Sequence, residues 1–217
     1  MNLELARFNM VEQQVRPCEV LDQKVLDLLL VVRREEFVPP AYRQLAFADA
    51  EIPLGHGATM LEPKIEAHAL QALQLKNQDR ALEIGAGSGF MAALLAAHAQ
   101  QVVAVEIVPE LAAMARANLK RQGIDNVVVE TGDAALGWPA RGPYDVIMIS
   151  GSLPVLPGEI LKQLKVGGRL FAIVGSEPVM EAQLVTRLGD DAWRTVNLFE
   201  TIAAPLVNAR QPASFTF

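Results

Sequence analysis

Short apolar runs alternate with segments of helical length along the chain from residue 80 onward. The runs are dominated by Val, Ile, Leu and Ala, as in strands that are buried on both faces. Strands that are separated by helices pair in parallel, and the helices cover the faces of the sheet. The pattern therefore predicts an open, doubly wound α/β fold with a mostly parallel sheet. We expect strands at residues 81–84, 102–105, 127–129, 146–149 and 170–174, and helices at 90–98, 109–121 and 159–164.

The chain before this alternation has a helical pattern. Aliphatic residues between positions 25 and 30 fall at helical spacing after Asp22, which we expect to be the N-cap. This helix ends before Pro39, because proline excludes its continuation. A glycine-containing loop over residues 55–59 then leads to a helix that is expected to begin at Pro63.

No segment rich in Pro, Gly or Ser divides the sequence. We therefore predict a single domain over residues 1–217. Within it, residues from about 1 to 78 form a helical N-terminal extension with the loop, and residues from about 79 to 217 form the α/β core and a C-terminal segment.

A glycine motif stands between the first expected strand and the helix after it. Gly85, Gly87 and Gly89 allow a tight reversal of the backbone and a close approach of a ligand to main-chain atoms. The third glycine follows the second by two residues, whereas the dinucleotide fingerprint places it three residues on. Glu83, before the first glycine, is unfavourable beside a diphosphate and suits a ligand with positive charge. The motif on its own is equally consistent with a simple tight turn.

Two more acidic residues follow the next two strands. Glu106 lies 21 residues after Gly85 (106 − 85), the spacing at which a carboxylate reaches both hydroxyls of a ribose. Asp133 is placed to meet the exocyclic amine of a purine. Each acid also has a structural interpretation, Glu106 as a helix-entry residue and Asp133 as an N-cap. Together with Glu83 they predict a pocket for a cationic nucleoside, which S-adenosylmethionine fits. The expected cofactor-binding residues are Glu83, Gly85, Ala86, Gly87, Gly89, Glu106, Ile107, Gly132, Asp133 and Ala134.

Composition excludes several classes of protein. The net charge of −6 is unfavourable for binding nucleic acid, so we expect no nucleic-acid partner. The single Cys18 cannot form an internal disulfide, and the three histidines lack the paired spacing of a zinc site, so we expect neither a disulfide nor a metal site. The low cysteine content also favours a cytoplasmic protein. Residues 1–10 lack the apolar region of a signal peptide. The uncharged stretch between Glu83 and Glu106 contains three glycines, so it reads as strand, turn and helix rather than as a membrane span.

Several motifs together resemble the protein-L-isoaspartate (D-aspartate) O-methyltransferases, which are class I S-adenosylmethionine-dependent enzymes. The resemblance covers roughly residues 37–175. It implies a substrate loop within the N-terminal part, a methyl group transferred to a carboxylate, and a protein, a peptide or a small molecule as the acceptor. The motifs are Phe37-Val38-Pro39, Gly55-His56-Gly57 with Thr59 and Pro63, the glycine motif, Gly132-Asp133, Pro143-Tyr144-Asp145, and residues 161–170. Residues 198–206 are similar to the final strand of the family.

The substrate loop departs from the family pattern at two positions. Leu61 stands where the family has its active-site serine, and Ala58 stands where it has glutamine. Leucine cannot donate a hydrogen bond to an acceptor carboxylate or help to orient the methyl donor. Thr59 is the best remaining polar contact and is the expected catalytic residue. His56 and Glu62 are candidate bases, although Glu62 is equally well explained as favourable negative charge at a helix N-terminus.

Three functions are weighed on these residues. The leading hypothesis is an S-adenosylmethionine-dependent methyltransferase that acts on a carboxylate of a damaged protein or peptide, or on a diverged acceptor. The second is a non-catalytic cofactor-binding or interaction protein, which would explain the absent serine. The third, a nicotinamide-dependent oxidoreductase, is disfavoured by the glycine spacing and by Glu83.

Overall fold

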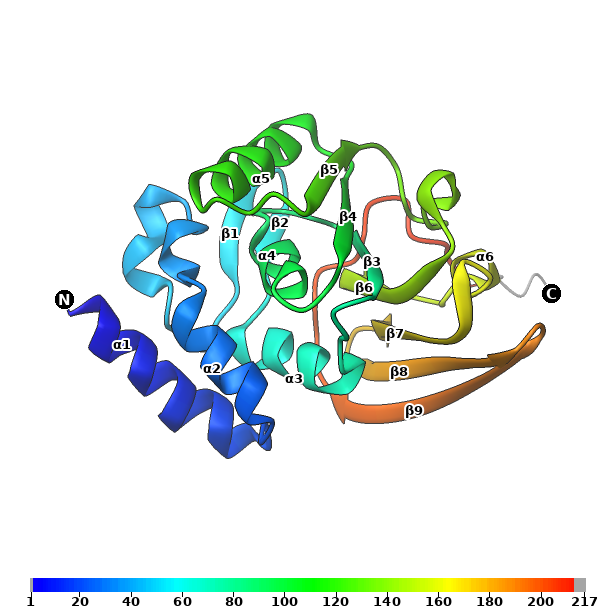
Figure 1. Cartoon of the computed structure of the whole chain (residues 1–217), viewed down its shortest axis with the longest axis horizontal. Helices are drawn as coiled ribbons and strands as arrows, with labels where there is room; N and C mark the ends of the chain where they lie inside the picture. Colours follow the sequence, from blue (N-terminus) through cyan, green and yellow to red (C-terminus); the bar gives the residue numbers. More distant parts are fainter. Residues whose placement is uncertain (1, 213–217) are drawn as a thin grey trace.

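A seven-stranded sheet forms the centre of the computed structural model, which describes residues 2–212 (Figure 1). The strand order is β5-β4-β3-β6-β7-β8-β9. Strands β5, β4, β3, β6 and β7 are parallel, and β8 and β9 continue the sheet as antiparallel strands. The strands are β3 (Arg80–Ile84), β4 (Gln101–Glu106), β5 (Val127–Thr131), β6 (Tyr144–Leu153), β7 (Leu164–Ser176), β8 (Val179–Gly189) and β9 (Ala192–Glu200). The doubly wound, mostly parallel architecture is therefore confirmed.

Helices cover both faces of this sheet. One face packs against α3 (Pro63–Leu73), α4 (Phe90–Ala96) and α5 (Pro109–Arg121), and the other against the short α6 (Gly158–Leu161). Side chains of β4 alternate between the two cores, because neighbouring residues of a strand point to opposite faces. Val102 and Ala104 join the core with α4, whereas Val103 and Val105 join the core with α6.

The N-terminal extension packs against the α4 side of the sheet. It contains α1 (Leu3–Met10), α2 (Gln23–Val31) and short turns of other helix types at Val11–Val15, Arg16–Cys18, Arg34–Glu36 and Pro40–Leu45. Asp22 caps α2, and its Oδ1 accepts a hydrogen bond of 2.9 Å from the backbone N–H of Lys24. The extension ends in a hairpin of β1 (Ile52–Gly55) and β2 (Ala58–Met60). Pro63 is the first residue of α3, as expected.

The C-terminal third differs from the sequence-based expectation. The helix expected over residues 159–164 is a single turn, because β7 already begins at Leu164. The expectation also missed β8 and misplaced the start of the last strand, since β9 begins at Ala192 rather than near Leu198. Charged residues interrupt both strands, and most of β9 is exposed, so no continuous apolar run marks them.

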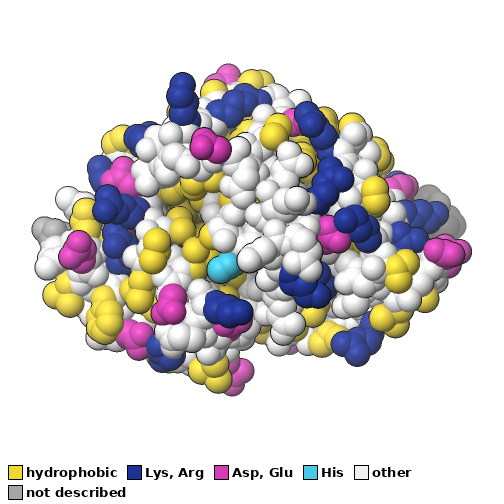
Figure 2. Space-filling view, viewed as in Figure 1, with side chains coloured by type: hydrophobic (Ala, Val, Ile, Leu, Met, Phe, Trp, Pro, Cys, Tyr) yellow, Lys and Arg dark blue, Asp and Glu magenta, His cyan; other side chains and the backbone are white. Residues whose placement is uncertain are grey.

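The surface carries mixed charge. Figure 2 shows basic and acidic side chains intermingled over one face of the molecule, with apolar side chains between them. None of the helices within residues 2–212 is both long and apolar enough to cross a membrane.

Candidate active site

An open cavity of about 780 Å³ lies at the carboxyl ends of the parallel strands. Ligands of open α/β sheets bind at this edge. Its walls come from the glycine motif, the ends of β4, β5 and β6, the β1–β2 hairpin and a C-terminal stretch. These lining segments fall within residues 56–61, 84–87, 105–108, 132–135, 150–151 and 204–207.

Two glycines of the motif expose backbone to this cavity. Gly85 and Gly87 have φ of +87° and +51°, which favours glycine over residues with a Cβ. A Cβ on Gly87 would lie 2.9 Å from Leu54, and one on Gly85 would lie 3.3 Å from Leu206. The turn is tied to the sheet by the backbone N–H of Gly85, which donates to the carbonyl of Val105 at 2.9 Å. This turn, which we call the glycine cradle, therefore requires glycine for two reasons: its backbone has positive φ, and neighbouring side chains leave no room for a Cβ.

Glu106 is the last residue of β4 and lines the cavity. Only 6% of its surface is exposed. Its Oε2 accepts a 2.8 Å hydrogen bond from the backbone N–H of Gly87, and its Oε1 accepts one of 3.0 Å from Val108. The carboxylate thus ties the glycine turn to the end of β4, and each oxygen keeps a free lone pair for a ligand hydroxyl.

Asp133 lies in the loop after β5, on the same wall of the cavity. Its Oδ1 accepts a hydrogen bond of 2.9 Å from the backbone N–H of Ala135, and its Oδ2 accepts one of 2.8 Å from the side chain of Asn208. Gly132, beside it, has no room for a side chain, since a Cβ there would lie 2.6 Å from the ring of Trp138. The loop is therefore fixed at both its backbone and its carboxylate.

Glu83 lies deeper than the other two acids. It is fully buried at the end of β3, and it lines a smaller second cavity beneath the glycine turn. Its Oε1 accepts a 2.9 Å hydrogen bond from the hydroxyl of Ser150, and its Oε2 has no partner. Burial raises the pKa of Glu83 well above its usual value, and the nearby carboxylates of Glu106 and Glu66 add to this rise against the opposing effect of Ser150.

The remaining predicted cofactor-binding residues lie at different depths. Ile107 and Ala134 line the main cavity, whereas Ala86 lines the smaller one. Gly89 serves the packing of two helices, because a Cβ there would lie 3.2 Å from Cα of Ala115 in α5.

The β1–β2 hairpin forms the opposite wall. Thr59 lines both cavities, and its hydroxyl donates to Oε2 of Glu51 at 2.9 Å. His56 is exposed at the turn of the hairpin and has φ of +54°. Glu62 is at the N-cap of α3, where its carboxylate pairs with Lys64 at 2.9 Å. Of the two candidate bases, His56 lines the cavity and Glu62 faces its own helix.

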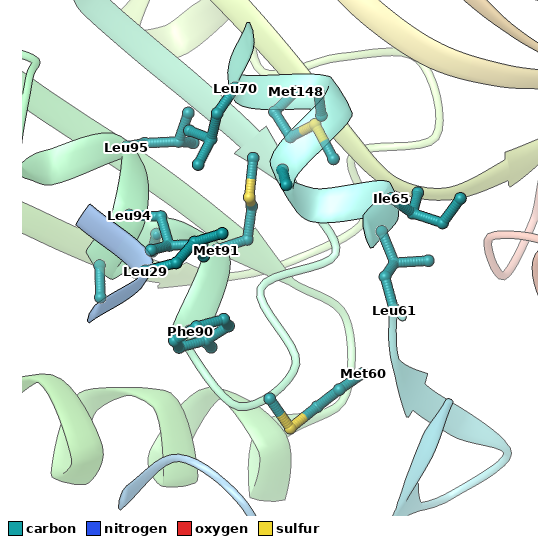
Figure 3. Close-up of a cluster of buried hydrophobic side chains, with 14 of the residues drawn as sticks. Leu29, Met60, Leu61, Ile65, Leu70, Phe90, Met91, Leu94, Leu95 and Met148 are labelled. Carbon is teal, nitrogen blue, oxygen red and sulfur yellow. The ribbon is translucent and has the colours of Figure 1, made fainter. Parts of the chain in front are cut away.

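Leu61 fills the position between the hairpin and α3. It is 6% exposed and lines both cavities. Figure 3 shows its side chain beside Ile65, at the margin of the apolar cluster around α4. Its carbonyl accepts a 2.7 Å hydrogen bond from Nη2 of Arg34. Leu61 is therefore held by its backbone and presents an apolar side chain to the site.

Arg34 and Glu66 form a buried ion pair behind Leu61. The guanidinium of Arg34 also lies over the ring of Phe90, 4.9 Å from its centre. Burial lowers the pKa of Arg34 and raises the pKa of Glu66, and their mutual attraction opposes both shifts. Sequence reasoning missed this pair, because nothing in the spacing of residues 34 and 66 predicts that they meet.

Two other parts of the wall were also missed. Ser150 and Gly151 follow the strand expected at residues 146–149, so the rule that ligands bind beyond the carboxyl ends of strands could have identified them. The stretch from Ala204 to Val207 overlaps residues 198–206, which resemble the final strand of the family, but β9 ends at Glu200 and the stretch forms only an isolated bridge at Pro205. It is placed by backbone hydrogen bonds to Ser152, whose N–H donates to Ala204 and whose carbonyl accepts from Leu206, both at 2.9 Å.

The arrangement fits an adenosyl cofactor. No three His, Cys, Asp or Glu side chains gather to hold a metal ion in the part of the chain that the structure describes. The cavity instead has a glycine cradle that added Cβ atoms would fill, and two carboxylates with free lone pairs. These are the groups that a nucleoside with hydroxyl and amino donors requires.

Comparison with known proteins agrees with this geometry. The sequence profile of the family "Protein-L-isoaspartate(D-aspartate) O-methyltransferase (PCMT)" matches residues 6–211. A protein-L-isoaspartate O-methyltransferase 2 of Marinobacter nauticus is 41% identical over 202 residues, which are 93% of this chain and 92% of the relative. A protein-L-isoaspartate O-methyltransferase of Myxococcus xanthus is 42% identical over 175 residues, 79% of this chain and 82% of the relative.

Two solved structures have the same fold. A protein-L-isoaspartate O-methyltransferase superimposes with a TM-score of 0.77 at 26% identity, over 93% of this chain and 66% of the solved chain. A putative one from Plasmodium falciparum, in complex with S-adenosyl-L-homocysteine, gives a TM-score of 0.79 at 21% identity, over 95% of this chain and 99% of that chain. The chain belongs to the protein-L-isoaspartate (D-aspartate) O-methyltransferase family and is an S-adenosylmethionine-dependent methyltransferase.

Proposed function

We propose that this enzyme transfers the methyl group of S-adenosylmethionine to the carboxylate of an L-isoaspartyl residue in a protein or peptide. The observation that carries the proposal is the single cavity in which Glu106 and Asp133 face the Thr59 hairpin. Family membership supplies the reaction class. In this proposal the methyl donor binds along the wall of Glu106 and Asp133, and the acceptor binds along the wall of the hairpin.

The donor is proposed to lie along the strand ends. Glu106 accepts from the ribose hydroxyls and Asp133 accepts from the adenine amine, through the lone pairs that their backbone contacts leave free. The glycine turn carries the methionine part, and Glu83 lies buried beneath this turn, at the end of β3. Bound S-adenosylmethionine supplies a methyl group on an already activated sulfonium. The proposed contacts are Glu83, Gly85, Ala86, Gly87, Glu106, Ile107, Gly132, Asp133 and Ala134, with Gly89 supporting the turn.

The acceptor needs no general base in this proposal. A carboxylate with a pKa near 4 is ionised at neutral pH, so no proton has to be removed before it attacks the methyl carbon. The protein has to align the two groups and exclude water. Thr59 is the polar side chain placed to orient the acceptor, once its hydroxyl turns from Glu51 toward the cavity. His56 and Glu62 have no required role as bases.

A cofactor-binding protein without activity is not favoured. The polar groups of the donor wall are all present, and the relatives with about 40% identity are methyltransferases by name. Leu61 affects only the acceptor side in this proposal. We further propose that the enzyme acts in the cytoplasm, which its lone cysteine favours, and without a nucleic-acid partner.

A methyl-release assay tests the proposal. Purified enzyme is incubated with labelled S-adenosylmethionine and either an isoaspartyl peptide or the aspartyl peptide of the same sequence. We expect labelled ester with the isoaspartyl peptide only, a loss of activity in Thr59→Val, and retention in Thr59→Ser, which keeps the hydroxyl. Equal labelling of both peptides, or no labelling while S-adenosylhomocysteine still binds, would show that the acceptor is a different one.

A further inference from the structure

The C-terminal strap, residues 203–210, runs beside the cavity, which its residues 204–207 line. Its first half is fixed to β6, where the hydroxyl of Ser152 donates to the carbonyl of Ala203 at 2.7 Å and a bridge pairs Ser152 with Pro205. Its last residue, Arg210, pairs with Glu159 at 2.8 Å. The strap therefore contacts the rest of the protein on both sides of residue 208.

Asn208 lies between these two anchors and reaches Asp133. Its side-chain amide donates to Oδ2 of Asp133 at 2.8 Å, while Oδ1 is already held by the backbone N–H of Ala135. Its φ of +62° lies in the left-handed region, which asparagine adopts more readily than most residues. Both oxygens of the carboxylate are therefore fixed, one by its own loop and one by the strap.

A carboxylate that is held on both oxygens keeps its plane and retains one lone pair on each oxygen. Such a group is a preorganised acceptor for a base that carries an amino group, and it disfavours a base with an oxygen at that position because two acceptors would then face each other. We propose that Asn208 is a positioning residue that orients Asp133 for the amino group of adenine and so sets the preference of the enzyme for an adenine-containing cofactor. This inference rests on the adenine site in the proposed function.

The position of the strap also argues against a second interpretation, in which the Asn208 amide competes with the adenine amine for Asp133. If Asn208 merely occupied the place of the adenine amine, the strap would have to move for the cofactor to bind. Asn208 instead contacts Asp133 without lining the cavity, whereas Leu206 lies against Gly85 and Gly151 at the cavity itself. Removal of the Asn208 amide is therefore expected to weaken the preference for an adenine base over a base with an oxygen at the same position. It is not expected to strengthen the binding of the cofactor.

The test measures the affinity of the full-length enzyme for S-adenosylhomocysteine and for S-inosylhomocysteine, in which the amino group is replaced by oxygen. The variants are Asn208→Gly, which tolerates the positive φ, and Asn208→Asp, which replaces the donor by an acceptor. The preference is expressed as the dissociation constant of the inosyl compound divided by that of the adenosyl compound. We expect this ratio to fall about fivefold in Asn208→Gly and further in Asn208→Asp, while the dissociation constant of the inosyl compound changes little. Asn197→Ala, which removes an exposed amide from β9, should leave the ratio unchanged.

Asp133→Ala separates the two proposals. If it leaves the ratio unchanged, the adenine site itself is placed wrongly. If it abolishes the preference whereas Asn208→Gly retains it, the adenine site stands and the role of Asn208 is refuted. Tighter binding of S-adenosylhomocysteine by Asn208→Gly would likewise refute it, because it would show that the amide competes with adenine.

Discussion

The two halves of the cavity are built in different ways. The donor half, formed by Gly85, Gly87, Glu106 and Asp133, places its polar groups at the ends of buried parallel strands, and each carboxylate is held by backbone N–H groups. The acceptor half, residues 52–61, is a short hairpin outside the main sheet. Its hydroxyl on Thr59 is engaged by Glu51, and Leu61 presents an apolar side chain. The donor half is therefore built on the edge of the sheet, whereas the hairpin is where this chain departs from the family pattern.

The largest effect is expected in the acceptor half. Leu61→Ser should raise methyl transfer to an isoaspartyl peptide, because one hydrogen-bond donor directed at a reacting group is worth about 2–4 kcal/mol. Leu61→Ala is the matched control, since it removes the same buried side chain without adding a hydroxyl. The assay is methyl transfer at saturating cofactor. Equal activity of the two variants would show that space, and not the hydroxyl, limits the reaction.

A smaller effect is expected in the donor half. Glu106→Ala should weaken binding of S-adenosylhomocysteine by about 1–3 kcal/mol, because the ribose loses a charged acceptor and the N–H groups of Gly87 and Val108 lose theirs. Glu110→Ala, an exposed change in the first turn of α5, should leave the affinity unchanged. Calorimetric titration measures both, with NAD as a ligand that should not bind. Unchanged affinity in Glu106→Ala would remove this residue from the donor half.

A third effect, on stability rather than on binding or methyl transfer, concerns Glu83, beneath the donor half. Because burial raises its pKa in the folded protein, the folded state keeps a proton that the unfolded chain releases as pH rises above the ordinary value of 4.5. The free energy of unfolding should therefore fall as pH rises from there toward the raised pKa, by at most about 1.4 kcal/mol per pH unit. Glu83→Gln cannot ionise, so its stability should exceed that of the wild type increasingly over this range.

Urea unfolding at several pH values between 4.5 and 7.5 checks this expectation; that range begins at the ordinary pKa of a glutamate, 4.5. Glu110→Gln, at an exposed position, is the control and should follow the wild type at every pH. A constant difference between Glu83→Gln and the wild type would show that Glu83 is already ionised in the folded protein.

The same contrast explains how far the sequence could be interpreted. Glu106 and Asp133 could be assigned to the cavity from the sequence, because continuous apolar runs mark the strands that precede them. The carboxyl ends of parallel strands all lie at the same edge of the sheet. The pair Arg34–Glu66 could not be foreseen, since it joins segments 32 residues apart through a tertiary contact. The C-terminal strap escaped prediction for a related reason. It is held partly by backbone hydrogen bonds, which leave no signal in the side-chain pattern, and partly by side chains that are far from it in sequence, such as Ser152, Asp133 and Glu159.

The central claim is that the donor half works independently of the change at Leu61. The direct measurement is the dissociation constant of S-adenosylhomocysteine for the wild type and Leu61→Ser, titrated in the same preparations that are assayed for methyl transfer. We predict that the two constants agree within about twofold while the activities differ, because Glu106, Asp133 and the glycine turn are unchanged. A dissociation constant that shifts tenfold or more with the activity would contradict the claim, since it would place residue 61 in the donor half.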